Sequence, residues 1–504
     1  MIKVRRVLIS VWDKKGLLEF ARKLKKMNIE IISTGKTAAL LHKGGVEAKK
    51  VSSLTSFPEI LSGRVKTLHP RVFGGVLVNK RHPLHMEEIR NLEIDPIDMV
   101  VVNFYPFRRM LKEKLTFDQM LEYIDIGGPA MLRAAAKNFK NVMPVSSPLA
   151  YRRVIDDLES HKGMVSENLS REFACEVFRL TKEYDAAIYS FLKKEEVLVW
   201  DLEKSISLRY GENPHQKGGL YKLAGSSNAE YTQLQGKPLS FNNFCDLDAA
   251  IAIVRSFTES AAVIVKHASP CGVACNKKLN RAYEEAYKCD PVSSFGGIVG
   301  FNRKIDGKTA QKILKTGFKE CIIAPSYSKE AVKLFSTKKN LRVLEINLNK
   351  TINNKDIKRT VFGYLLQDNN NAIIEKNQMK IVTKRKPTQR EMADLLFAWR
   401  VVKSVKSNAI VAAKNGVTLG IGAGQPSRVG SVKIALGSAT KSIRGAVIAS
   451  DGFFPKPDSI KLMKKYGIKA IIQPGGSIKD PDIIEACNKA NIAMVNTGLR
   501  HFRH

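Results

Sequence analysis

Short apolar and β-branched runs alternate with helix-like patterns over roughly the first 150 residues. Runs of this kind predict strands, and apolar positions three or four residues apart predict helices between them. Strands are predicted at residues 7–11, 30–32, 99–103 and 142–145. One helix is predicted to start at residues 17–21, and a second follows residues 33–37 and continues through Leu41. This alternation is typical of an α/β domain in which helices connect parallel strands.

Helical spacing dominates the next stretch of the chain, from about residue 150 to residue 200. Phe178, Tyr184, Ile188 and Phe191 recur at intervals that suit one face of a helix. The character of the sequence changes around residues 200–209. We therefore expect a first domain that ends close to this segment.

The rest of the chain contains a diverged internal repeat. Four strand-like segments occur twice in the same order, and the second copy follows the first by about 150 residues. The pairs are 263–267 with 410–414, 297–299 with 446–448, 321–325 with 470–474, and 342–346 with 492–496. We therefore expect two copies of one α/β unit, an arrangement that leaves room for a site between them.

The 504 residues have an ordinary globular composition and a large positive charge. Hydrophobic residues make up 44% of the chain, which excludes a mostly disordered protein. Lys and Arg number 83 against 48 Asp and Glu, and the net charge of +35 favours anionic partners of any kind. The basic residues are dispersed, and their densest cluster is residues 384–386. This favours a lysine-rich surface and leaves a nucleic-acid-binding protein as the alternative from another class.

The cysteines and the apolar runs indicate a cytoplasmic protein. The seven cysteines are odd in number and follow no disulfide-like spacing, so we interpret them as reduced thiols. No run approaches the ~18 consecutive apolar residues of a membrane span. The N-terminal apolar run is short and ends before Asp13, unlike a secretory signal.

One short segment of the first domain is a candidate phosphate cradle. Thr34, Gly35, Lys36 and Thr37 lie between a predicted strand and a predicted helix, where free N–H groups and the helix dipole attract anions. The segment is not a nucleotide P-loop, because that motif needs a glycine where this chain has Glu30. A simple capped helix start explains the same residues equally well.

A second basic segment follows at residues 63–70. If it is extended, Arg64 and Lys66 lie on one side, and Thr67 adds a hydroxyl donor. Such a group suits a phosphate or a developing oxyanion, and an exposed basic strand edge is the alternative.

Two further cations follow residues 125–129 on a predicted helix. Arg133 and Lys137 are four residues apart and share one helix face. Stacked cations repel one another, so an anion between them would stabilise the pair.

The second half of the chain offers Lys266 and His267 after a strand with a buried pattern. The neighbouring positive charge disfavours protonation of the imidazole, which favours neutral His267 as a base near pH 7. On this pair alone, a structural histidine is the simpler interpretation. Cys271 and Cys275 lack the H-x-E and P-C-x-x-C spacing of zinc deaminases, so no zinc is expected. The glycines of residues 420–424 likewise miss the dinucleotide spacing.

A dozen runs, in order from residue 10 to the last residue, together resemble one family. It is the bifunctional phosphoribosylaminoimidazolecarboxamide (AICAR) formyltransferase/IMP cyclohydrolase of purine biosynthesis. The runs are SVWDKKGL, GRVKTLHPRV, NFYPF, DIGGPAMLRAAAKN, LRYGENPHQ, VIVKHASPCGVA, DPVSSFGGIVGFN, VKSNAIVAAKNG, GIGAGQPSRV, SDGFFP, QPGGS and RHFRH. The last run suggests that the chain is complete.

The resemblance implies an α/β protein of three parts. Residues 1–197 would be a methylglyoxal-synthase-like parallel-sheet domain that performs cyclohydrolysis. Residues 198–365 and 366–504 would be tandem cytidine-deaminase-like subdomains without zinc, which perform formyl transfer. The resemblance also implies 10-formyltetrahydrofolate as cosubstrate, no metal or nucleotide cofactor, and a homodimer whose transformylase sites are completed across the subunit interface.

The resemblance implies site residues for ring closure in the first domain. Those expected to hold the ribotide are Trp12, Asp13, Lys14, Thr34, Gly35, Lys36, Thr37, Arg64, Thr67, Asn103, Ile126, Gly127 and Arg133. Those expected to surround the ring closure are Lys66, Tyr105, Asp125 and Lys137, with Lys137 transferring a proton. Trp12 replaces the small or hydroxylated residue expected at its position, which makes a protein with only one active half a further alternative.

The resemblance also implies site residues for formyl transfer. His267 would be the base, Lys266 would steady the charge on the formyl group, and Asn408 would orient the carboxamide. The remaining ligand contacts would be Arg209, Tyr210, Gly296, Glu320, Arg428, Phe453, Ser477, Ile478 and Arg500. Of these, Glu320 stands where some members of the family have Asp.

Overall fold

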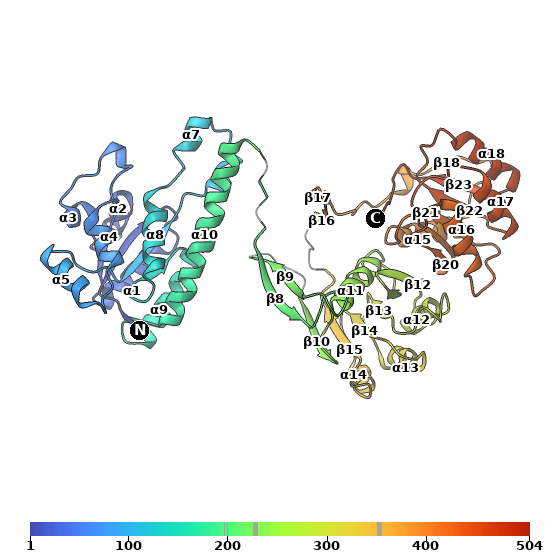
Figure 1. Cartoon of the computed structure of the whole chain (residues 1–504), viewed down its shortest axis with the longest axis horizontal. Coiled ribbons are helices and arrows are strands. Elements are labelled where there is room, and N and C mark those ends of the chain that lie inside the picture. The colour runs from blue at the N-terminus through green and yellow to red at the C-terminus, as the bar shows by residue number, and fades with distance from the viewer. Residues whose placement is uncertain (196, 199, 225–229, 350–354) are drawn as a thin grey trace. The chain divides into compact units, whose positions relative to one another are not determined.

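The computed structural model describes residues 1–195, 197–198, 200–224, 230–349 and 355–504. They form two units, Met1–Trp200 and Asp201–His504 (Figure 1). The first unit ends at Trp200. The change in sequence character predicts this boundary around residues 200–209, and the resemblance implies an end at residue 197.

The first unit is built on a five-stranded parallel sheet with the order β4-β3-β2-β5-β6. The strands are β2 (Arg6–Val11), β3 (Glu30–Ser33), β4 (Lys49–Lys50), β5 (Met99–Asn103) and β6 (Met143–Val145). Four of them, β2, β3, β5 and β6, are the strands that the apolar runs predict. The prediction of a parallel sheet with crossover helices is therefore confirmed.

Helices cover both faces of this sheet because its strands carry apolar side chains on both sides. One face shares a buried core with α1 (Leu17–Lys26), α2 (Gly35–Lys43) and α9 (Tyr151–Ser160). The other face shares a core with α4 (Pro70–Leu77), α8 (Gly127–Lys137) and α10 (Glu167–Lys193). Shorter elements are β1 (Ile2–Lys3), α3 (Val51–Thr55), α5 (Pro83–Asn91), α6 (Phe107–Met110), α7 (Phe117–Leu121) and β7 (Met164–Val165).

The second unit contains a twelve-stranded sheet with the order β10-β15-β14-β13-β11-β12-β20-β19-β21-β22-β23-β18. Its first half consists of β10 (Tyr231–Gln235), β11 (Ala261–Lys266), β12 (Ser269–Cys275), β13 (Ile298–Phe301), β14 (Cys321–Ala324) and β15 (Arg342–Ile346). Its second half consists of β18 (Lys380–Ile381), β19 (Ile410–Lys414), β20 (Val417–Gly422), β21 (Val447–Ser450), β22 (Ala470–Gln473) and β23 (Ala493–Asn496).

The two halves of this sheet are copies of each other, as the internal repeat predicts. Strands β11, β13, β14 and β15 are the first set of repeated segments, and β19, β21, β22 and β23 are the second. The halves meet at β12 and β20, which are equivalent strands and pair antiparallel. There the Thr418 hydroxyl accepts from Val273 N at 2.9 Å and donates to Val273 O at 3.1 Å.

Helices cover both faces of the second sheet, and they also follow the repeat. A core on one face contains α11 (Phe241–Val254) and its counterpart α15 (Gln389–Val402), and both helices begin with a capping box. The other face is covered in the first half by α12 (Leu279–Tyr287), α13 (Gly307–Lys315) and α14 (Lys329–Ser336). In the second half it is covered by α16 (Arg428–Gly437), α17 (Asp458–Lys465) and α18 (Asp480–Ala490).

Two hairpins of the second unit lie outside the large sheet. One pairs β8 (Leu202–Leu208) with β9 (Gly218–Leu223), and the other pairs β16 (Lys355–Thr360) with β17 (Gly363–Asp368). The predicted border between residues 365 and 366 falls inside β17.

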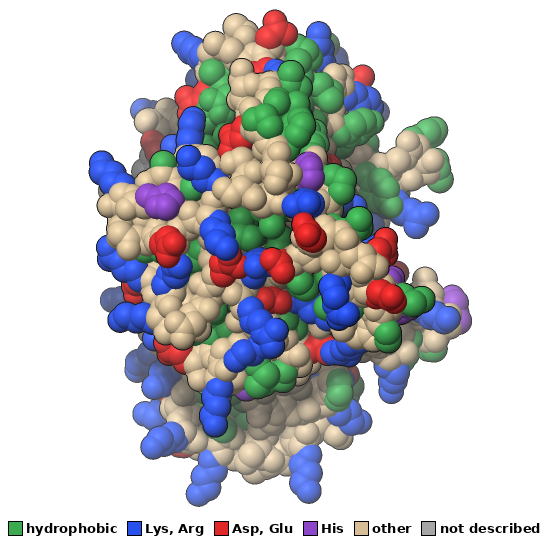
Figure 2. Space-filling model, turned by 90° about the vertical axis from the view of Figure 1, so that its left-hand side faces the viewer, with side chains coloured by type: hydrophobic (Ala, Val, Ile, Leu, Met, Phe, Trp, Pro, Cys, Tyr) green, Lys and Arg blue, Asp and Glu red, His purple; other side chains and the backbone are tan. Residues whose placement is uncertain are grey.

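The charged surface shows no single basic stripe on the face in Figure 2, where Lys and Arg side chains are scattered among acidic and apolar ones. Within the residues that the structure describes, no helix is both long enough and apolar enough to cross a membrane.

Candidate functional site

The candidate site of the first unit lies at the carboxyl edge of the parallel sheet. Because β2, β3 and β5 are parallel, the loops that follow them emerge at the same edge. Asn103 ends β5, and its Oδ1 accepts from the N–H of Trp12 at 2.7 Å and of Asp13 at 2.8 Å. Its Nδ2 donates to Asp13 O at 3.0 Å, so this one amide holds the loop after β2.

The predicted phosphate cradle forms the start of α2 at the same edge. Thr34 is the N-cap residue, and its side chain makes no capping hydrogen bond. Its hydroxyl lies 2.9 Å from that of Ser10, and the Thr37 hydroxyl donates to Val11 O at 3.2 Å. The two hydroxyls therefore tie the helix to β2, and the Thr34 side chain leaves the first N–H groups of α2 uncapped. Lys36, in the first turn of this helix, is exposed.

Asp125 and Lys66 lie close together at the start of α8. The Asp125 Oδ1 accepts from Gly128 N at 3.0 Å, and Asp125 N donates to the Tyr184 hydroxyl at 2.8 Å. Burial raises the pKa of the Asp125 carboxyl above its usual value. The hydrogen bond from Gly128 N and the charge of Lys66 lower this pKa, but burial has the larger effect. This carboxyl is therefore protonated more readily than an exposed aspartate.

Thr67 packs against the same helix start. It is buried, and a Cβ added at Gly127 would lie 2.9 Å from the Thr67 hydroxyl oxygen. A side chain at position 127 would therefore push Thr67 away, which explains why glycine suits this position. Lys66, Thr67, Asp125 and Gly127 thus form one group.

Aromatic side chains stand beside this group. The rings of Trp12 and Tyr105 lie 6.4 Å apart, and Tyr105 meets Tyr123 edge to face at 5.9 Å. Trp12 and Tyr105 are both exposed. Trp12, the residue that departs from the expected family pattern, therefore belongs to a cluster of aromatic side chains with Tyr105 and Tyr123.

Other predicted residues of the first unit have protein partners of their own. Exposed Arg64 forms an ion pair with Glu122, and Lys14 Nζ donates to Trp12 O at 3.2 Å. Arg133 donates to the Thr181 hydroxyl at 3.2 Å and lies over the Phe178 ring, so its guanidinium contacts α10. Ile126 is exposed.

Lys137 lies at the other end of α8. Ten residues of helix separate it from Gly127, which is about 15 Å along the axis. The next residue, Asn138, donates to Val76 O and Val78 O at 2.8 Å and also bonds Asn141. Asn141 O accepts from Lys80, which pairs with Asp98 just before β5, at the amino edge of the sheet. The structure therefore does not bring Lys137 to Asp125, and its role in the ring closure stays a prediction.

In the second unit, Lys266 and His267 lie at the turn between β11 and β12. His267 is exposed and has a positive φ of 51°, and Lys266 Nζ donates to Phe295 O at 3.0 Å. That contact places Lys266 beside predicted Gly296, which has a φ of 71°. Glu320 lies nearby, because its N–H donates to Gly297 O at 3.1 Å.

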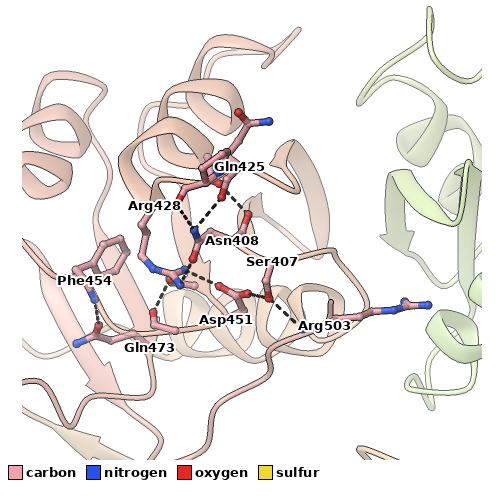
Figure 3. A network of polar contacts seen from close by, with 12 residues as sticks. Ser407, Asn408, Gln425, Arg428, Asp451, Phe454, Gln473 and Arg503 are labelled. Atoms are coloured by element: carbon pink, nitrogen blue, oxygen red, sulfur yellow. Dashed lines mark hydrogen bonds and ion pairs between the residues drawn. The ribbon is translucent and has the colours of Figure 1, made fainter. Parts of the chain in front are cut away.

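A second group in this unit surrounds Asn408 (Figure 3). Its Oδ1 accepts from Arg428 at 2.7 Å, and its Nδ2 donates to Gln425 O at 2.8 Å. Arg428 Nη1 also lies 2.5 Å from Asp451 Oδ1, and the Ser407 hydroxyl donates to Asp451 Oδ2. Arg428 is therefore a buried, neutralised cation that orients the Asn408 amide.

This group forms one side of a cavity of about 430 Å³. The lining residues include Asn408, Arg428, Phe453, Lys456 and Phe502. A Cβ at Gly452 would lie 2.6 Å from Arg428 Nη2 and 2.7 Å from the Phe502 ring, so a side chain there would displace both. The lining of the cavity therefore combines two aromatic side chains with the cation of Lys456.

Sequence reasoning missed Ser407, Asp451 and Phe502 in this group. The signal was present, because the runs VKSNAIVAAKNG, SDGFFP and RHFRH contain them. Their importance comes from contacts across long separations, such as Arg503 N to the Ser407 hydroxyl at 3.0 Å.

The remaining predicted residues lie on other parts of the second unit. The Arg209 guanidinium donates to the Tyr210 hydroxyl at 2.7 Å, and Arg500 stacks 4.4 Å from the centre of the Phe502 ring. Ser477 accepts from Lys479 N at 3.1 Å, and Ile478 is almost fully exposed. Arg500 is therefore next to the cavity, through Phe502.

Burial raises the pKa of the Cys271 thiol and of the Cys275 thiol to about 12. Cys275 pairs with Ala261, at the end of the β11–β12 hairpin that lies away from the His267 turn, so the two thiols do not form one group with His267. Across the described residues, no three His, Cys, Asp or Glu side chains gather as a metal site.

Comparisons with known proteins cover nearly the whole chain. A family model described as AICARFT/IMPCHase bienzyme matches residues 135–438, and one described as MGS-like domain matches residues 16–130. The bifunctional purine biosynthesis proteins PurH of Bacillus cereus (strain AH187) and Bacillus anthracis are each 48% identical over 511 residues, covering 99% of this chain and 100% of each relative. The crystal structure of ForH is 32% identical over 38% of this chain and 99% of that chain, with a TM-score of 0.34.

Proposed function

The chain belongs to the AICARFT/IMPCHase bienzyme family, and from this we propose how its two units divide two reactions. The enzyme is a bifunctional AICAR transformylase and IMP cyclohydrolase, which catalyses the last two steps of IMP synthesis. We assign cyclohydrolysis to Met1–Trp200, which contains the MGS-like match, and formyl transfer to Asp201–His504.

Formyl transfer needs a base because the 5-amino group of AICAR is conjugated with the imidazole carboxamide and is a poor nucleophile. We assign 10-formyltetrahydrofolate as the formyl donor. His267 takes the amine proton as the nitrogen attacks the formyl carbon, and Lys266 stabilises the oxyanion. The bond from the formyl carbon to folate then breaks, and the proton passes to the folate nitrogen.

The cavity beside Asn408 supports the binding of a flat heterocycle. The Arg428 guanidinium is buried and paired with Asp451, so we assign it the orientation of Asn408 and not a direct contact with the phosphate. Asn408 then faces the carboxamide, and Phe453 and Phe502 contact the ring. Lys456 and Arg500 supply positive charge nearby.

Ring closure needs the carboxamide nitrogen to attack the formyl carbon, followed by loss of water. Lys66 stabilises the oxygen of the formyl group as it becomes an oxyanion, and this oxygen takes up the proton that the attacking carboxamide nitrogen loses. Asp125, with its raised pKa, then donates a proton to the resulting hydroxyl, which leaves as water, and Asp125 regains a proton from the former formamide N–H as the ring C=N bond forms. The start of α2, Lys36 and Arg64 bind the phosphate. Tyr105 and Trp12 contact the ring.

One observation carries the assignment of two activities to two units. Each unit has its own group of catalytic type: Lys66 with Asp125 in the first, and Lys266 with exposed His267 in the second. The test is to incubate the enzyme with AICAR and 10-formyltetrahydrofolate and to identify products by mass spectrometry. IMP supports both assignments. Formyl-AICAR alone would show an inactive first unit, which Trp12 would explain, and no product would overturn the proposal.

We also propose a cytoplasmic homodimer without nucleic-acid partners. The family resemblance supports the dimer. The dispersal of Lys and Arg along the sequence, with no basic stripe on the face that Figure 2 shows, supports the exclusion of nucleic acid. Sedimentation of the purified chain, alone and with duplex DNA or RNA, tests both statements.

A further inference from the structure

The turn that carries His267 has a structural twin in the second repeat. The hairpin of β11 and β12 turns at His267 and Ala268, and the hairpin of β19 and β20 turns at Asn415 and Gly416. All four residues have positive φ, of 51° and 54° in the first turn and of 58° and 67° in the second. Two consecutive residues of this kind between paired strands are typical of a type I′ turn.

The two turns differ in how well their residues suit this conformation. Asn and Gly are the residues that a type I′ turn prefers, because they adopt the left-handed region at little cost. Histidine tolerates this region better than most residues, whereas the Ala268 side chain is disfavoured there. The turn with the proposed base therefore needs support that its twin can do without.

The same frame of contacts surrounds both turns. Lys266 Nζ donates to Phe295 O at 3.0 Å, and Lys414 Nζ donates to Arg444 O at 2.9 Å. Both acceptors precede a glycine with positive φ, Gly296 in the first repeat and Gly445 in the second.

A helix carboxylate also bonds the second residue of each turn. Asp246 of α11 accepts from Ala268 N at 2.6 Å, and Asp394 of α15 accepts from Gly416 N at 2.8 Å. A hydrogen bond to an ionised acceptor is stronger than a neutral one. Because the frame is common to both repeats, the carboxylate alone cannot be a device of catalysis. Its importance differs between the repeats, since only the first turn is strained.

We propose that Asp246 is a positioning residue for formyl transfer, which keeps the strained His267–Ala268 turn in the conformation that presents the imidazole to the substrate. The proposal rests on the assignment of His267 as the base. Asp246 acts through the backbone of Ala268 and touches neither substrate nor folate. Without the hydrogen bond from Ala268 N to Asp246, the turn relaxes toward backbone conformations that suit Ala268 better, and the His267 imidazole moves away from the substrate.

The central experiment compares Asp246→Ala with the matched control Asp394→Ala in the full-length enzyme. For Asp246→Ala we expect kcat for formyl transfer to fall about tenfold or more, with a smaller change in KM for AICAR. For Asp394→Ala we expect formyl transfer within about twofold of the parent, because Asn415 and Gly416 keep their turn unaided. Cyclisation of supplied formyl-AICAR should be unchanged in both variants, because it takes place in the other unit.

Rescue separates a positioning role from a merely structural one. Adding Ala268→Gly to Asp246→Ala supplies a residue that adopts positive φ at little cost, and should recover most of the lost kcat. Asp246→Asn keeps an acceptor oxygen and should lose only about threefold, which guards against a misfolded alanine variant. Equal losses in Asp246→Ala and Asp394→Ala, or a loss that Ala268→Gly does not recover, would overturn the proposal.

A parallel His267→Ala variant distinguishes the two ideas. If it keeps normal formyl transfer, the assignment of the base fails, and the positioning role fails with it. If it loses transfer while Asp246→Ala keeps it, the base assignment stands and the positioning role alone is wrong.

Discussion

Arg428 Nη1 lies 2.5 Å from Asp451 Oδ1, and the two side chains are 6% and 0% exposed. Removing one partner of a buried pair leaves an uncompensated charge in the interior. Asp451→Ala should therefore lower the free energy of unfolding by about 3–5 kcal/mol, measured by chemical denaturation.

The control for this variant is Glu485→Ala, which breaks the exposed pair of Glu485 with Lys489. Exposed pairs contribute little, so stability should hardly change. Asp451→Ala should also lower formyl transfer by disturbing Asn408, and a variant with unchanged stability and transfer would contradict the role given to the pair.

The strongest prediction for catalysis concerns His267. Because His267 is the base for formyl transfer, the His267→Ala variant should show formyl transfer that is lower by about 10²–10⁴-fold. Cyclisation of supplied formyl-AICAR should continue, because its groups lie in Met1–Trp200. Assays of both reactions and a melting curve on the same variant check this. A structural histidine would instead lower both activities together with the melting temperature.

Arg64→Ala tests the phosphate contacts of the first unit. Loss of a charge-assisted contact should weaken binding of formyl-AICAR about tenfold or more, with formyl transfer nearly unchanged. Calorimetric titration with the ribotide measures the change. Glu122→Gln, which frees Arg64 from its exposed ion pair, is the matched control and should not weaken binding. Equal damage to both activities in Arg64→Ala would show that the sites are assigned to the wrong units.

His501 should make stability depend on pH. It is buried against Trp399, with Asn370 at 2.9 Å from its Nδ1. Burial lowers the pKa of His501 from 6.5 to about 4, and the charge of Lys403 adds to this while Asp451 opposes it. The folded protein therefore keeps this imidazole neutral, while the unfolded chain binds a proton below about pH 6.5.

The sign follows directly from this difference. The contribution of His501 is fully present above pH 6.5 and is lost as the pH falls toward 4, by about 3 kcal/mol in all. Denaturation at several pH values, with His501→Gln as the variant that cannot titrate, isolates this contribution. Parallel pH profiles for the two proteins would contradict it.

The two units should also be separable. Residues 1–200 contain their own sheet and two buried cores, so this fragment should fold alone and cyclise formyl-AICAR. Circular dichroism and the cyclisation assay check the fragment. An insoluble or inactive fragment, beside an active full chain, would show that the units depend on each other.

Patterns that are local in the sequence predicted the fold well. The strands β2, β3, β5 and β6 follow from apolar runs, and the two copies of one α/β unit in the second sheet follow from the repeat, whereas the order of the strands in that sheet was not predicted. Both signals come from side chains a few residues apart, or from one segment repeated at a constant offset.

The site was harder to predict, because its geometry depends on the lengths of helices and on contacts between residues that are far apart in the sequence. Lys137 shares a helix with the residues after Asp125, yet the length of α8 carries it to the opposite edge of the sheet. The resemblance implies that Arg428 contacts the ligand, and only the fold reveals that Asp451 neutralises its charge. Such pairings join residues far apart in the chain and leave no local signal.

The junction of β12 with β20 joins two equivalent strands of the repeat in antiparallel pairing. In a two-fold symmetric dimer, the same surface of each subunit forms the interface. The second unit therefore has the form of a two-fold symmetric dimer contained in one chain. Because the two copies need not be identical, one turn carries His267 while its twin carries the unstrained Asn415 and Gly416.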